Sequence, residues 1–138
     1  GVSGVMTSHA IYTALDAEKP ATLSRVIVHD LLRKGLGFDG LVLTDDLEMG
    51  AIAGDWGVAR GAAEAFAAGA DLLLVCEDQH LVRKGLEHIR RKLLRKELPM
   101  ERLHHAMERI QRARSRFLKG WQRASTAEVE AFFHSARG

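Results

Sequence analysis

The stretch "GLVLTDD", residues 40–46, is an apolar run that stops at two adjacent carboxylates, Asp45 and Asp46. Its length suits a strand that is buried on both faces, as the strands of a parallel sheet are. Two other stretches, "GVMTSH" at 4–9 and "DLLLVCED" at 71–78, share this character. We therefore predict three strands of one sheet.

The segments between these strands have helical patterns. In "LSRVIVHDLLRKGLG", Ser24 can cap a helix, and Gly35 suits the position just after its end. The alanine-rich run 58–68 favours a second helix, which Gly69 can stop. Strands that alternate with helices, with no hairpin signal between them, indicate a parallel α/β fold. The apolar face of the first helix is predicted to hold Val26, Ile27, Leu31 and Leu32.

After the third strand the pattern is helical. Pro99 separates two amphipathic segments whose outer faces are basic. We predict a short helical tail at residues 119–138, in which Ser125 or Thr126 can cap one more helix. The two apolar stripes, which we interpret as core packing, are Val82, Leu86, Ile89 and Leu93, and then Met100, Leu103, Met107, Ile110 and Phe117.

The chain has 138 residues, of which 46% are hydrophobic and 28% charged, as in one soluble domain. No apolar run approaches the roughly 20 residues of a membrane-spanning helix, and the N-terminus lacks a signal-peptide pattern. We therefore expect a cytoplasmic protein with no membrane partner. Cys76 is the single cysteine, and its apolar surroundings predict a buried structural thiol.

Basic residues exceed acidic ones only in the C-terminal part of the chain. Residues 1–77 hold 5 Lys and Arg against 11 Asp and Glu, whereas residues 78–138 hold 15 against 7. This positive half leaves a basic helical nucleic-acid-binding module as one alternative function. The basic residues are spread along helix faces without aromatic stacking platforms, so we expect no nucleic-acid partner.

Asp45 and Asp46 lie where a parallel strand ends, which is the edge at which α/β proteins place their chemistry. Carboxylates there can act as nucleophile, general base or metal ligand, and adjacent residues leaving a strand point in different directions. Asp46 can also cap a helix that begins near Leu47. A second alternative is Mg²⁺-dependent phosphoryl transfer by both aspartates, with a further carboxylate from Glu77 or Asp78. The histidines show no metal-ligand spacing, so no metal site is predicted.

Three motifs carry a resemblance to a known family: "PATLS", "LLRKGLGFDG" joined to "TDDLEM", and "AGADLLL". Together with "LPMERLHHAMERI", they resemble the C-terminal half of the catalytic barrel of glycoside hydrolase family 3, in particular its bacterial β-N-acetylhexosaminidases. The resemblance covers residues 1–118. It implies a partial (β/α)8 TIM barrel, with about the last three βα units followed by amphipathic helices.

The resemblance also implies a reaction. The family's catalytic nucleophile falls on Asp45, in a retaining glycosidase that releases terminal β-linked N-acetylglucosamine during peptidoglycan recycling. Met49 matches a position that lines the sugar pocket. His9 matches a histidine common in the hexosaminidase group, and two roles stay open for it: a contact to the sugar, or a packed and hydrogen-bonded structural histidine. The implied partner is a saccharide that contains N-acetylglucosamine, and no cofactor is implied.

One part of the family pattern is missing. Hexosaminidases of this kind carry their general acid/base on a loop with a Lys-His-x-x-Gly-His-Gly pattern, which does not occur in this chain. Without a proton donor for the leaving group, we expect the 138 residues to be inactive alone. Because only three strands are predicted, we further expect a piece of a longer enzyme, whose exposed sheet edges favour self-association.

Overall fold

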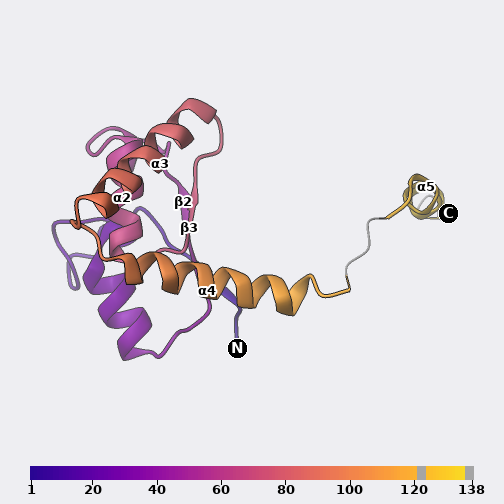
Figure 1. Cartoon of the computed structure of the whole chain (residues 1–138), viewed down its shortest axis with the longest axis horizontal. Helices are drawn as coiled ribbons and strands as arrows, with labels where there is room; N and C mark the ends of the chain where they lie inside the picture. The colour runs from indigo at the N-terminus through magenta and orange to yellow at the C-terminus, as the bar shows by residue number, and fades with distance from the viewer. Residues whose placement is uncertain (121–123, 136–138) are drawn as a thin grey trace.

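The computed structural model describes residues 1–120 and 124–135 (Figure 1). Strands β1 (Gly4–Met6), β2 (Leu41–Asp46) and β3 (Leu72–Leu74) form one parallel sheet in the order β1-β2-β3. Each predicted stretch therefore holds a strand of the same sheet, and the parallel α/β class is confirmed.

Strands β1 and β3 are shorter than the predicted stretches at 4–9 and 71–78. The Thr7 N–H just after β1 still donates to the Leu43 carbonyl of β2 at 2.8 Å, but the next carbonyl, that of Ser8, accepts the N–H of Thr22 in a later turn at 3.1 Å. After β3, the carboxylates of Asp46 at the end of β2 and of Glu48 just beyond it accept the backbone N–H groups. Both strands end early because their backbone groups find partners outside the sheet.

Helices connect the strands, and further helices follow β3. Figure 1 shows α2 and α3 on one side of β2 and β3, and α4 crossing below these strands. In chain order the elements are the short 3₁₀ turn η1 (Ala21–Leu23), the π-type helix η2 (Val26–Gly35), α1 (Gly50–Ala53), α2 (Val58–Ala68), α3 (Gln79–Leu94), α4 (Met100–Phe117) and α5 (Thr126–Ser135).

The core lies between β2 and the helices that cover one of its faces. Val42 and Thr44 are fully buried on that face, and Leu47 and Ile52 are fully buried just after the strand. α2 has the predicted bounds and contributes mainly small side chains, which allow close packing. Its buried residues are Val58, Gly61, Ala62, Ala63, Ala65, Phe66 and Ala68.

Gly69 ends α2, as predicted. Its φ of 130° lies in a region that side-chain-bearing residues rarely adopt, and its N–H donates to the carbonyls of Ala65 and Phe66. An added Cβ at Gly69 would also lie 3.0 Å from Val28 Cγ1. Glycine is therefore required at this position by both the backbone and the neighbouring helix η2.

Helix η2 buries a different face from the predicted one. Val28 is fully buried and Leu32 packs against the core, whereas Val26 and Leu31 are exposed. The wider π-type winding explains the difference, because it rotates successive side chains away from the 3.6-residue spacing. It is visible at the end of η2, where the Leu36 N–H donates to the Leu31 carbonyl five residues back at 2.9 Å.

Of the two predictions for the ends of η2, one is confirmed and the other is wrong. Ser24 caps the helix as predicted, since its Oγ accepts the N–H of Ile27 at 3.2 Å. The placement of Gly35 just after the helix is wrong, because η2 runs through Gly35. The left-handed backbone that ends the segment occurs at Gly37, with a φ of 64°.

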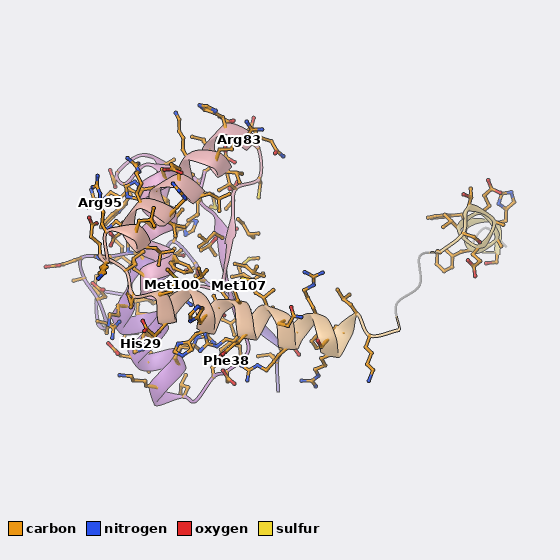
Figure 2. The ribbon with its side chains drawn as sticks, in the orientation of Figure 1. His29, Phe38, Arg83, Arg95, Met100 and Met107 are labelled. Carbon is orange, nitrogen blue, oxygen red and sulfur yellow. The ribbon has the colours of Figure 1, made fainter. Side chains whose placement is uncertain are left out.

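The inner faces of α3 and α4 keep only part of the predicted stripes. Ile89 is buried, and Leu93 and Leu103 pack against the core. Four residues of the predicted stripes are exposed instead: Leu86 of α3, and Met100, Met107 and Phe117 of α4. Figure 2 labels Met100 and Met107 among the side chains of α4. α4 crosses the sheet with Ala106 at its buried point, and the inward positions beside it belong to arginines.

A buried carboxylate accounts for these inward arginines. The side chain of Asp71, just before β3, is 0% exposed and pairs with Arg33 at 2.5 Å, Arg109 at 3.3 Å and Arg102 at 3.4 Å. Its Oδ2 also accepts the N–H of Val42 at 3.1 Å. Burial is the main cause that lowers the pKa of both Arg33 and Arg102, and Asp71 opposes this effect. The cluster ties η2 and α4 to the N-terminal end of the sheet.

Part of the predicted tail is helical: α5 spans Thr126–Ser135, whereas residues 119–120 and 124–125 are not helical. Ser125 Oγ accepts the N–H of Glu128 at 3.3 Å, and Glu128 Oε2 accepts the N–H of Ser125 at 2.7 Å, which is a capping box at the start of α5. Residues 121–123 and 136–138 of the tail lie outside the described residues. Within the described ranges, no helix is both long and apolar enough to cross a membrane.

Candidate active site

The C-terminal end of β2 presents its two aspartates to opposite faces of the sheet. Leu41, Leu43 and Asp45 share one face and are half-buried, whereas Val42 and Thr44 on the other face are fully buried. Asp45 therefore lies on the face that α2 does not cover. The predicted divergence of Asp45 and Asp46 follows from this alternation.

The Asp45 carboxylate is held by its neighbour's backbone. Its Oδ1 accepts the N–H of Asp46 at 2.8 Å. Among the described residues, no Lys or Arg lies within ion-pair distance of Asp45. The carboxylate is thus oriented from within its own strand and is open on the uncovered face.

Asp46 supports the local turn but does not cap a helix. Its Oδ1 accepts the N–H of Glu48 at 3.1 Å and that of Cys76 at 3.3 Å. α1 begins only at Gly50, and Met49 occupies its N-cap position without a side-chain hydrogen bond. The predicted cap near Leu47 is wrong, because β2 continues through Asp46 and a turn precedes the helix.

His9 lies beside the same strand end. Its Nε2 donates to the Asp46 carbonyl at 2.9 Å, because a carbonyl oxygen can only accept, and its Nδ1 lies 2.8 Å from Thr22 Oγ1. Both ring nitrogens thus have partners within the chain. Met49 is exposed at the start of α1. The sugar contacts expected of His9 and Met49 stay predictions.

A residue that the sequence reasoning missed connects two loops at this edge. Glu48 accepts the N–H of Glu77 at 2.7 Å and that of Asp78 at 3.1 Å. Asp78 in turn caps α3, since its Oδ1 accepts the N–H of His80 at 2.7 Å. The only sequence signal for Glu48 is its position in "TDDLEM", which does not reveal a partner 29 residues later.

Cys76 is exposed, so the prediction of a buried thiol is wrong. The reason is that β3 ends at Leu74, which leaves Cys76 in the loop beyond the sheet. Partial desolvation, followed by the negative charge of Asp46, raises the pKa of the Cys76 thiol. Both effects disfavour the thiolate, which is the reactive form.

The geometry also bears on the magnesium alternative. Asp45 and Asp46 diverge, and the Asp78 carboxylate is engaged at the start of α3. Within residues 1–120 and 124–135, no group of three His, Cys, Asp or Glu side chains is arranged to hold a metal ion. The two aspartates are therefore not arranged as joint ligands of one cation.

Comparison with known proteins identifies the family. The model of the glycosyl hydrolase family 3 N terminal domain matches residues 1–113. The chain belongs to glycoside hydrolase family 3. The matched range includes the whole sheet, Asp45 and helices η2 through the first part of α4.

Relatives of this family 3 chain are β-hexosaminidases. It is 42% identical to the β-hexosaminidase of Chromobacterium violaceum over 76 residues, which is 55% of this chain and 21% of the relative. It is 37% identical to that of Neisseria meningitidis serogroup C over 90 residues, 65% of this chain and 25% of the relative. The chain therefore spans about a fifth to a quarter of the length of these curated relatives.

Solved structures of family 3 enzymes superpose on most of the chain. A β-N-acetylglucosaminidase from Paenibacillus sp. str. FPU-7 matches 91% of this chain and 24% of its own, with a TM-score of 0.87 and 36% identity. The β-N-acetylhexosaminidase from Beutenbergia cavernae matches 83% of this chain and 34% of its own, with a TM-score of 0.78 and 36% identity. The predicted resemblance to the bacterial hexosaminidase type of family 3 is confirmed.

Proposed function

We propose that this chain supplies the nucleophile of a retaining β-N-acetylhexosaminidase, and that Asp45 is this nucleophile. The observation that carries the proposal is the position of Asp45 at the C-terminal end of a parallel strand, on the uncovered face of the sheet. The hydrogen bond from the Asp46 N–H orients Oδ1 at 2.8 Å. The match of residues 1–113 to the family 3 model and the likeness to β-hexosaminidases support the same assignment.

In this reaction the Asp45 carboxylate attacks the anomeric carbon of a terminal β-linked N-acetylglucosamine. The bond to the leaving oxygen breaks through an oxocarbenium-like transition state, and a glycosyl ester forms on Asp45. Water then attacks the same carbon and releases the sugar with retained configuration. Each step needs an acid/base group about 5 Å from the nucleophile, on the other side of the glycosidic bond.

We assign that acid/base group to a part of the barrel outside these 138 residues. The Lys-His-x-x-Gly-His-Gly pattern does not occur in the chain. In this proposal β1, β2 and β3 are the last three strands of a (β/α)8 barrel, and the first five βα units carry the proton donor. The isolated chain is then inactive, and the complete enzyme releases N-acetylglucosamine from cell-wall fragments during cytoplasmic peptidoglycan recycling.

A segment exchange tests this proposal. Residues 1–113 of this chain replace the matching segment of the Beutenbergia cavernae enzyme, and hydrolysis of a chromogenic N-acetyl-β-glucosaminide is measured. We expect turnover by this chimera and none by the 138-residue chain alone. Asp45→Ala in the chimera should reduce kcat by more than about a thousandfold, as removal of a nucleophile does elsewhere.

The matched control is Asp55→Ala, because Asp55 is an exposed carboxylate ten residues away. It should leave turnover unchanged. A chimera whose Asp45→Ala variant keeps full turnover would exclude Asp45 as the nucleophile. A fluorinated sugar that accumulates the glycosyl-enzyme should label the peptide that contains Asp45, which gives a readout independent of the turnover rate.

A further inference from the structure

The carboxylate of Asp46, the last residue of β2, and that of Glu48 just beyond it bind three successive backbone N–H groups of the loop after β3. Asp46 Oδ1 accepts the N–H of Cys76 at 3.3 Å. Glu48 Oε2 accepts that of Glu77 at 2.7 Å, and Glu48 Oε1 accepts that of Asp78 at 3.1 Å. Because β3 ends at Leu74, these three donors have no sheet partner and depend on the carboxylates.

The same two residues are linked to the nucleophile. Asp46 Oδ1 also accepts the N–H of Glu48, and the N–H of Asp46 donates to Asp45 Oδ1. Hydrogen bonds therefore run without a gap from the loop at residues 75–78, through Glu48 and Asp46, to Asp45. At the far end of the loop, Asp78 caps α3.

The charge of Glu48 strengthens the bonds that it accepts. Hydrogen bonds from backbone N–H groups to a carboxylate are roughly twice as strong as bonds between neutral groups. Glu48 accepts two of them, from the successive residues Glu77 and Asp78, and these bonds hold the backbone of the loop in place.

We propose that Glu48 is a positioning residue, whose carboxylate fixes the loop at residues 75–78 against the strand that carries Asp45. The role of Glu48 in turnover rests on the proposed function, because Glu48 acts by holding the loop that lies beside the nucleophile Asp45. Glu48 itself makes no contact with the sugar in this proposal. Loss of its carboxylate should therefore lower kcat more than it raises KM.

The clamp is tested first in the 138-residue chain, without any activity. Amide hydrogen exchange of Glu77 and Asp78 should be about tenfold faster in Glu48→Ala, and intermediate in Glu48→Gln, which keeps the shape and one acceptor. Glu87→Ala, which removes an exposed carboxylate of α3, should leave the exchange of both amides unchanged.

Unchanged amide exchange of Glu77 and Asp78 in Glu48→Ala would overturn the clamp. In the chimera, we expect Glu48→Ala to lower kcat about tenfold or more, with partial rescue in Glu48→Gln. Unaltered kcat and KM in Glu48→Ala would overturn the positioning role. A chimera that is inactive even with Glu48 present would contradict the proposed function, while the exchange experiment would still decide on the clamp.

Discussion

At the scale of single residues, Asp71 determines how the N-terminal end of the sheet is held. Its side chain is 0% exposed, and the three arginines around it are 8%, 13% and 19% exposed. Removing a buried carboxylate from water is costly, and here the ion pairs and the Val42 N–H offset that cost. Without the carboxylate, several positive charges would be left close together in a largely buried position.

Asp71→Asn tests this dependence. We expect the free energy of unfolding to fall by about 3–5 kcal/mol, because a buried ion pair would lose one partner. Urea denaturation followed by circular dichroism measures the change. Asp39→Asn is the matched control, since Asp39 is 62% exposed and pairs with Arg109 and Arg112 at the surface. It should cost less than about 1 kcal/mol, and equal losses in both variants would contradict the role of burial.

The sequence predicted the positions of some side chains at the candidate site, but not their hydrogen-bond partners. The position of Asp45 and Asp46 at a strand end, and their divergence, follow from local alternation and were predictable. The partners of Glu48 and His9 were not, because these bonds join residues 13 to 37 positions apart in the chain. The burial of Asp71 was also missed, since the arginines that make it tolerable come from two distant helices.

At the scale of elements, the start of η2 depends on a short polar network. Ser24 Oγ accepts the N–H of Ile27 and donates to Asp16 Oδ2 at 2.6 Å. Asp16 Oδ1 accepts the N–H groups of Glu18 and Lys19. The Ser24 hydroxyl is the main cause that lowers the pKa of Asp16 below its usual 3.8. One serine thus holds both the helix start and the loop before it.

The lowered pKa of Asp16 sets the direction of a pH effect. The Asp16 carboxylate stabilises the fold at pH values above its unfolded-state pKa. This contribution is lost as the pH falls through the lower folded-state pKa of the same group. Ser24→Ala should lower the free energy of unfolding by about 1 kcal/mol at neutral pH, because the helix cap is lost. The difference in this free energy between the variant and the unaltered chain should be smaller at about pH 3. Urea denaturation at both pH values measures this difference. Ser115→Ala, on the exposed face of α4, is the control, and a gap that widens in acid would contradict the network.

Two glycines in helix interiors should respond oppositely to alanine. At Gly85 of α3, an added Cβ would lie 3.4 Å from Ala62 Cβ, so Gly85→Ala should gain up to about 1 kcal/mol of helix propensity. At Gly61 of α2, it would lie 2.5 Å from Cγ2 of the fully buried Ile52. Gly61→Ala should therefore lose about 1–3 kcal/mol. Thermal unfolding of both variants checks the pair, and a shift of the same sign in both would contradict the packing of α2 against α1.

Elements with a local signal were predicted better than those decided by packing. The bounds of α2 follow from its alanine content and Gly69, and the order of strands and helices follows from the short apolar runs. The π-type winding of η2 has no such signal, so its buried face was assigned wrongly. α4 turns Arg102 and Arg109 inward because Asp71 lies beneath it, which overrides its apolar stripe.

At the scale of the whole molecule, the sheet is covered on one face only. Leu41, Leu43 and Asp45 are half-buried on the other face, and β1 beside them exposes Gly4 and Met6. Half-exposed apolar side chains on a parallel sheet are unusual, because such sheets are normally covered on both sides. In the proposed barrel this face is the interior, which the first five βα units would close.

If the first five βα units close the barrel over the uncovered face, Leu43 should contribute more to the free energy of unfolding in the chimera than in the 138-residue chain. Leu47→Ala should cost about 2–5 kcal/mol in the 138-residue chain, because Leu47 is fully buried there. Leu43→Ala should cost less than about 1.5 kcal/mol in the same chain, since half-buried Leu43 loses less contact.

In the chimera with the Beutenbergia cavernae barrel, the cost of Leu43→Ala should rise into the range of Leu47→Ala, because the added strands would bury Leu43. Urea denaturation of the chain and the chimera compares the four variants. If Leu43→Ala remained mild in the chimera while Leu47→Ala stayed severe, the uncovered face would not be the interior of a closed barrel.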